Sequence, residues 1–227
     1  SAGAAFLLAL DWATDMRLKT PMLMLALPFV GFVIAWLYAR VGQSVEAGNN
    51  LLIDEIHDPK KVIPLRMAPL VFVGTVASHL CGASVGREGT AVQMGGALAD
   101  QLSLPFHLED NQRRVVLMAG ISAGFSAVFG TPLAGAIFAL EVLAIGRLRY
   151  DALWPCLLSA LLAHAVCLAW GVHHTVYSAG VIPPMSLASI FAAVAAGGLF
   201  GLTGRFFAVL THTLASVFKR IFAYAPW

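Results

Sequence analysis

Apolar blocks of helical length divide this chain, and only short polar stretches separate them. The longest blocks cover residues 21–40, 151–170 and 186–214. A bilayer core about 30 Å thick is crossed by a helix of roughly 20 apolar residues. Backbone amides in lipid must also be satisfied within their own segment, which favours helices over loops. The pattern therefore predicts an all-α polytopic membrane protein.

The composition agrees with this prediction and narrows the class of partner. Hydrophobic residues make up 59% of the chain and charged residues 11%, and the mean hydropathy is +0.81. Soluble domains usually carry about 25% charged residues. The net charge of +2 is too small to indicate a nucleic-acid partner. We expect the lipid bilayer as a partner and no cofactor or metal, since the three cysteines lie apart in apolar blocks.

One stretch, residues 82–90, interrupts the apolar pattern with several glycines and the charged pair Arg87 and Glu88. A helix that begins inside the membrane points free N–H groups and its positive dipole end toward the membrane centre, which favours an anion. Gly86 and Gly89 bracket Glu88, and glycine lets a backbone approach an ion closely. The stretch predicts an anion site at the start of a short helix.

Glu88 is the most informative residue of this stretch. A carboxylate at membrane depth is costly, so a functional role is the default interpretation. The helix start favours its ionised form, whereas desolvation favours its protonated form. Glu88 could then occupy the anion site when ionised and leave it when protonated, which would couple protons to anions. The alternatives are a structural ion pair with Arg87 or a helix cap.

Two stretches resemble motifs of the CLC family of anion channels and proton-coupled antiporters. Gly-Arg-Glu-Gly-Thr at 86–90 resembles the gating-glutamate motif, and residues 120–141 resemble the helix pair that follows it. The resemblance implies a CLC-type fold of short, tilted, broken helices in two inverted repeats. Residues 1–185 would form the first repeat and 186–227 the first helix of the second. It also implies that Glu88 is the gate and proton carrier, and that the full-length protein is a homodimer.

Three departures from the chloride-handling members favour the bacterial fluoride/proton antiporter branch. Where those members have a Gly-Ser-Gly-Ile-Pro loop, this chain reads Gly-Asn-Asn-Leu-Leu at 48–52. Thr90 replaces the proline that ends their gate motif, and Val142 replaces a second, inner glutamate of many antiporters. The carboxamides of Asn49 and Asn50 can each donate two hydrogen bonds to a small, strongly hydrated anion. The alternative role of both asparagines is helix capping.

The sequence therefore predicts a transporter rather than an enzyme: a multi-pass fluoride/proton antiporter that exports fluoride across the bacterial inner membrane. Its ligands would be fluoride and protons. By the resemblance the second half of the transporter is missing here, so we expect no transport by this chain alone. The predicted gate is Glu88, and the predicted anion-binding residues are Asn49, Asn50, Gly86, Arg87, Gly89 and Thr90.

Alternative functions remain open at this point. The nearest is a chloride-type CLC channel or chloride/proton antiporter. A membrane subunit without transport activity is more remote. An intramembrane hydrolase is equally remote, and it arises because residues 120–124 fit the Gly-x-Ser-x-Gly nucleophile pattern around Ser122.

Overall fold

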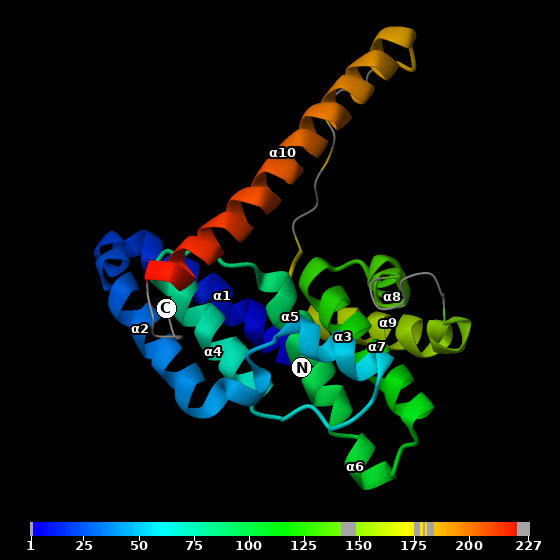
Figure 1. Ribbon diagram of the computed structural model, residues 1–227. Helices are drawn as coiled ribbons and strands as arrows, with labels where there is room; N and C mark the ends of the chain where they lie inside the picture. The colour runs from blue at the N-terminus through cyan, green and yellow to red at the C-terminus, as the bar shows by residue number, and fades with distance from the viewer. Residues whose placement is uncertain (1, 142–148, 175–177, 179, 181–183, 222–227) are drawn as a thin grey trace. The chain divides into compact units, whose positions relative to one another are not determined.

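The computed structural model describes residues 2–141, 149–174, 178, 180 and 184–221. Contacts divide the chain into two compact units, residues 1–174 and 175–227. All regular elements of the described residues are helical, which confirms the predicted all-α class (Figure 1). The division into inverted repeats at residue 185 stays a prediction. The α-helices are α1 (Ala2–Lys19), α2 (Leu27–Leu37), α3 (Asn49–His57), α4 (Met67–Leu80), α5 (Arg87–Asp100), α6 (Ser103–Phe106), α7 (Asp110–Phe129), α8 (Pro132–Glu141), α9 (Leu153–Ala169) and α10 (Leu187–Ile221).

Three helical segments are long and apolar enough to cross a membrane. They are Pro21–His57, Tyr150–Ala169 and Leu187–Ile221, with mean hydropathies of 2.1, 1.9 and 1.8. The apolar helices Met67–Leu80 and Pro132–Glu141 are shorter. This mixture of full spans and short helices agrees with the sequence pattern, and the predicted break between α4 and α5 is confirmed.

Two helices extend through charged residues at one end. Helix α1 continues through the charged residues after Leu10 and ends at Lys19, where basic side chains in its last turn suit the negative end of the helix dipole. Helix α7 begins at Asp110, in a polar segment. Glu109 and Gln112 form a capping box there, which satisfies two otherwise unpaired N–H groups.

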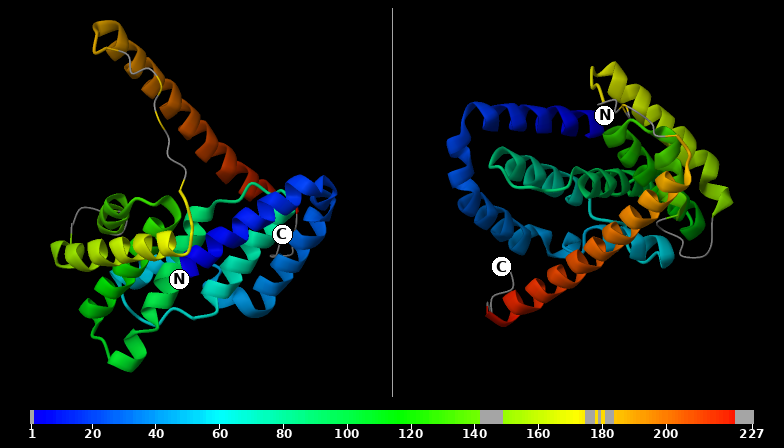
Figure 2. Two further views of the ribbon diagram at one scale, coloured as in Figure 1. Left: turned by 180° about the vertical axis from the view of Figure 1, so that it is seen from behind. Right: turned by 90° about the horizontal axis from the view of Figure 1, so that it is seen from above.

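Helix α7 is the centre of the first unit. It packs against α3, α5, α8 and α9. Helix α4 lies between α1 and α2, and it also contacts α5 (Figure 2). The two short helices α3 and α5 are therefore held against a central scaffold rather than projecting alone.

Small residues let α5 and α7 approach each other at backbone distance. A Cβ added to Gly120 of α7 would lie 2.5 Å from the carbonyl oxygen of Gly95 on α5. A Cβ on Gly124 would overlap the carbonyl oxygen of Ala91. Close packing of this kind is the usual way in which helices associate in lipid.

We expect Gly120→Ala to lower the free energy of unfolding by about 1–3 kcal/mol, because the carbonyl it meets belongs to a rigid backbone. Chemical unfolding in detergent measures this loss. Gly31→Ala is the matched control, since Gly31 lies in α2 with no atom within 4 Å of the added methyl group. That control should be neutral or slightly stabilising, and equal losses in both variants would contradict the packing argument.

Serine hydroxyls join α7 to α9. Ser122 donates to the carbonyl oxygen of Cys156 at 2.9 Å, and Ser126 donates to that of Ala160 at 2.8 Å. Both serines are fully buried. Ser122 thus lies in the middle of a helix, with its hydroxyl bonded to a carbonyl, and not at the strand-to-helix turn of a hydrolase nucleophile. In this chain the Gly-x-Ser-x-Gly pattern forms a helix-packing surface.

Candidate anion site

The starts of two short helices meet at Asn49. This residue begins α3, and its Oδ1 accepts a hydrogen bond from Nε2 of Gln93 on α5 at 3.1 Å. A Cβ added to Gly89, in the first turn of α5, would lie 3.3 Å from Asn49 Nδ2. Leu52 of α3 packs against Gly96 of α5, where an added Cβ would overlap its side chain. The positive ends of two helix dipoles are therefore close together, as an anion site requires.

Gly48 turns the chain into α3. Its φ of 59° and ψ of −124° lie in a region that only glycine adopts without strain. Gly48 occupies the N-cap position, and no side chain caps the helix there. The capping alternative for Asn49 and Asn50 is therefore wrong, because both already lie inside the helix. Asn49 instead bonds α5, and both asparagines are exposed.

Gly86 lies in ordinary extended backbone. Its φ is −70° and its ψ is 137°, and a Cβ there would meet no atom within 4 Å. Gly89 is more closely surrounded, because an added Cβ would lie 3.3 Å from Nδ2 of Asn49. The predicted approach of either glycine to an ion stays a prediction.

Glu88 and Arg87 lie in the first turn of α5, and both are exposed. The predicted burial of Glu88 is thus not seen among the described residues, because the first turn of α5 extends beyond the helices packed on its later turns. The two alternative roles of Glu88, a helix cap and an ion pair with Arg87, are not seen in the described residues either. Gly86 holds the N-cap position, and no ion pair joins Glu88 to Arg87 within the described part of the chain. The carboxylate therefore lies exposed at the start of α5.

Thr90 differs from the exposed residues Arg87 and Glu88 before it. It is buried, and its hydroxyl makes a hydrogen bond of 2.6 Å with the hydroxyl of Thr75 on α4. The side chain therefore joins α4 to α5, and the predicted anion-binding role of Thr90 stays a prediction. Val142, the predicted substitute for an inner glutamate, lies outside the described residues.

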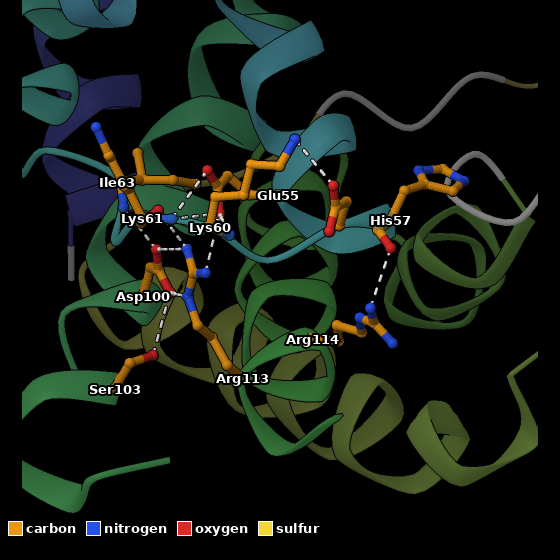
Figure 3. Close-up of polar contacts among 10 residues, drawn as sticks. Glu55, His57, Lys60, Lys61, Ile63, Asp100, Ser103, Arg113 and Arg114 are labelled. Atoms are coloured by element: carbon orange, nitrogen blue, oxygen red, sulfur yellow. Dashed lines mark hydrogen bonds and ion pairs between the residues drawn. The ribbon is translucent and has the colours of Figure 1, made fainter. Parts of the chain in front are cut away.

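A buried ionic cluster holds the far ends of α3 and α5 (Figure 3). Arg113 of α7 donates through Nε and Nη2 to the two carboxylate oxygens of Asp100, at 2.7 and 2.8 Å. Its Nη1 donates to Glu55 Oε2 at 2.9 Å. The three side chains are 7%, 0% and 9% exposed, respectively. Because Glu55 belongs to α3 and Asp100 ends α5, one guanidinium fixes both helices.

The same cluster also orders the connection between α3 and α4. Glu55 accepts hydrogen bonds from the backbone N–H groups of Lys60 and Lys61. Asp100 accepts one from the backbone of Ile63 at 2.7 Å, and Arg113 donates to the carbonyl of Lys61 at 2.7 Å. Sequence reasoning missed this cluster, although isolated charges such as Asp100 beside apolar residues were a signal that could have found it.

The outer side of the α3–α4 connection is exposed to solvent. Lys60 Nζ lies 2.9 Å from Asp58 Oδ2, and both side chains are 71% exposed. The hydrogen bond and charge of Lys60 hold the pKa of Asp58 below its ordinary value. Such exposed pairs add little stability. The buried cluster of Arg113, Glu55 and Asp100 therefore holds α3 and α5 in position.

Comparison with known proteins identifies the family of this chain. The sequence model described as "Voltage gated chloride channel" matches residues 30–227. A relative from Pseudomonas syringae pv. tomato named "Chloride/fluoride channel protein" is 61% identical over 226 residues, which cover 100% of this chain and 50% of the relative. The "H(+)/Cl(-) exchange transporter ClcA" of Vibrio vulnificus is 30% identical over 200 residues, covering 87% of this chain and 41% of its own length.

Solved structures give the same result. The crystal structure of a CLC-type fluoride/proton antiporter has a TM-score of 0.92 and 33% identity, and the match covers 100% of this chain and 57% of that one. A slow cyanobacterial Cl⁻/H⁺ antiporter has a TM-score of 0.78 at 23% identity over 96% of this chain and 55% of its own, which shows the shared fold alone. The chain spans about half the length of the curated relatives it matches. It is a membrane protein of the CLC family.

Proposed function

We propose that this chain forms the first part of a fluoride/proton antiporter that exports fluoride across the bacterial inner membrane. The observation that carries the proposal is the meeting of the α3 and α5 helix starts, where Asn49 lies close to Gly89, the residue that follows Glu88. Support comes from the relative named for chloride and fluoride and from the structural similarity to a CLC-type fluoride/proton antiporter.

In the proposed mechanism, fluoride and the Glu88 carboxylate compete for the same donors. These are the free N–H groups of the first turn of α5, from Arg87 to Gly89, and the carboxamide of Asn49. When ionised, Glu88 occupies them. When protonated, it releases them, and fluoride enters. Each cycle then carries a proton one way and a fluoride ion the other.

The proposal also extends to the rest of the transporter. Residues 1–185 form the first inverted repeat and 186–227 begin the second, whose remaining helices cover the exposed first turn of α5. We call the natural protein that carries this chain together with that second half, acting as a homodimer, the full-length protein. This chain reconstituted alone should show no fluoride efflux above background.

A paired flux measurement tests the proposal. The full-length protein in liposomes loaded with fluoride should release fluoride and take up protons, both recorded with ion-selective electrodes. Fluoride efflux without proton movement would make the protein a channel. Proton-coupled efflux of chloride with no fluoride movement would make it a chloride/proton antiporter, the second candidate that the Vibrio vulnificus relative suggests.

Asn49→Ser tests the anion preference. The change replaces two carboxamide N–H donors by one hydroxyl donor, so the preference for fluoride over chloride should fall by about ten-fold. Initial rates of efflux with each anion give the ratio. Asn111→Ser is the matched control, because Asn111 is an exposed residue of the first turn of α7, away from the α3 and α5 helix starts. A ratio that is unchanged in Asn49→Ser would argue against a role of Asn49 in selecting the anion.

A further inference from the structure

Gln93 bridges α5 to the candidate anion site but does not lie at a helix start itself. It follows the first turn of α5 and is half-buried. Its Nε2 donates to Asn49 Oδ1 at 3.1 Å. A Cβ on Gly48 would lie 3.2 Å from the same Nε2 atom, so the glycine at the start of α3 leaves room for the Gln93 carboxamide. The glutamine is therefore fitted against the residues that begin α3.

This hydrogen bond decides which end of the Asn49 carboxamide faces the site. A carboxamide has an acceptor oxygen and a donor NH₂ group, and rotating it by half a turn exchanges the two. Because Oδ1 is bonded to Gln93, Nδ2 is the end that lies toward Gly89 and the first turn of α5. An anion there meets N–H donors. In the reversed orientation it would meet a carbonyl oxygen, which repels it.

We infer that Gln93 is a positioning residue for fluoride: it holds the Asn49 carboxamide with its donor end toward the anion. This inference rests on the proposed function, because it assigns the orientation of a group at that same site. Gln93 acts through Asn49 and does not itself bind the ion. Its effect should accordingly depend on the presence of the asparagine.

A double-mutant cycle in the full-length protein tests the inference, with fluoride affinity measured by isothermal titration and by the KM for efflux. Gln93→Met keeps the length of the side chain and removes its amide. It should weaken fluoride affinity by about five-fold, with kcat little changed. In an Asn49→Ser background the same substitution should have no further effect, since the carboxamide it orients is gone.

Gln101→Met is the matched control. Gln101 follows α5 at its opposite end, where it donates to the carbonyls of Ile63 and Ala97 at 2.8 and 2.9 Å. Its loss removes comparable hydrogen bonds yet should leave fluoride affinity unchanged. An unchanged affinity in Gln93→Met, or an equal loss with and without Asn49, would overturn the inference while the wild-type protein still exchanges fluoride for protons. A wild-type protein that exchanges neither would instead overturn the proposed function.

Discussion

In the full-length protein, Glu88→Gln should reduce fluoride-driven proton movement to background. The substitution keeps the shape of the side chain but removes the carboxylate that can take up and release a proton. Glu88 lies in the first turn of α5, beside the N–H groups that we propose as fluoride donors. A neutral amide can neither be repelled by the anion nor carry a proton away, so coupling is lost whatever happens to fluoride binding. Parallel recordings of fluoride and pH in proteoliposomes measure this directly.

Glu141→Gln is the control for this experiment. Glu141 ends α8 and is an exposed carboxylate, as Glu88 is. It lies outside the α3 and α5 helix starts, and its neutralisation should leave the coupling of protons to fluoride intact. Proton movement that persists at the wild-type rate in Glu88→Gln would contradict the assignment of the gate.

Arg113→Met should cause a large loss of stability. Removing the guanidinium leaves the carboxylates of Glu55 and Asp100 buried without their cation. Breaking one partner of a buried ion pair costs about 3–5 kcal/mol, because the remaining charge is neither hydrated nor paired. The backbone of the α3–α4 connection also loses its bond from Arg113 to the carbonyl of Lys61. Unfolding in detergent measures the change in free energy.

The neighbouring residue provides a close comparison. Arg114 is less buried, and it donates to the carbonyl of His57 at 3.0 Å and to Asn111 Oδ1 at 3.3 Å. It does not join the carboxylates of Glu55 and Asp100, so Arg114→Met should cost at most about 1 kcal/mol. Similar losses of unfolding free energy in the two variants would show that the cluster around Arg113 contributes no more to stability than the bonds of Arg114 do.

Local sequence signals were enough to predict the break before α5. The glycines and charges of residues 82–90 interrupt an apolar run, and α5 begins within this stretch, at Arg87. Such a feature depends only on neighbouring residues, so the sequence alone can predict it.

Contacts between distant parts of the chain could not be predicted in the same way. Nothing near Asn49 in the sequence indicates that it bonds Gln93, and nothing near Arg113 indicates that it joins Glu55 to Asp100. Such pairs form because α3, α5 and α7 pack together. The burial expected for Glu88 also failed, because the sequence shows that a charge interrupts an apolar run but not which helices cover it.

A fluoride titration of the full-length protein at several pH values, all high enough for fluoride to stay ionised, tests the competition between fluoride and Glu88 most directly. If the carboxylate occupies the donors at the start of α5, protonating it frees them. Fluoride affinity should then rise as the pH falls, with protons taken up on binding, and Glu88→Gln should abolish this dependence. A fluoride affinity that is the same at every pH, or a pH dependence that survives in Glu88→Gln, would contradict the account.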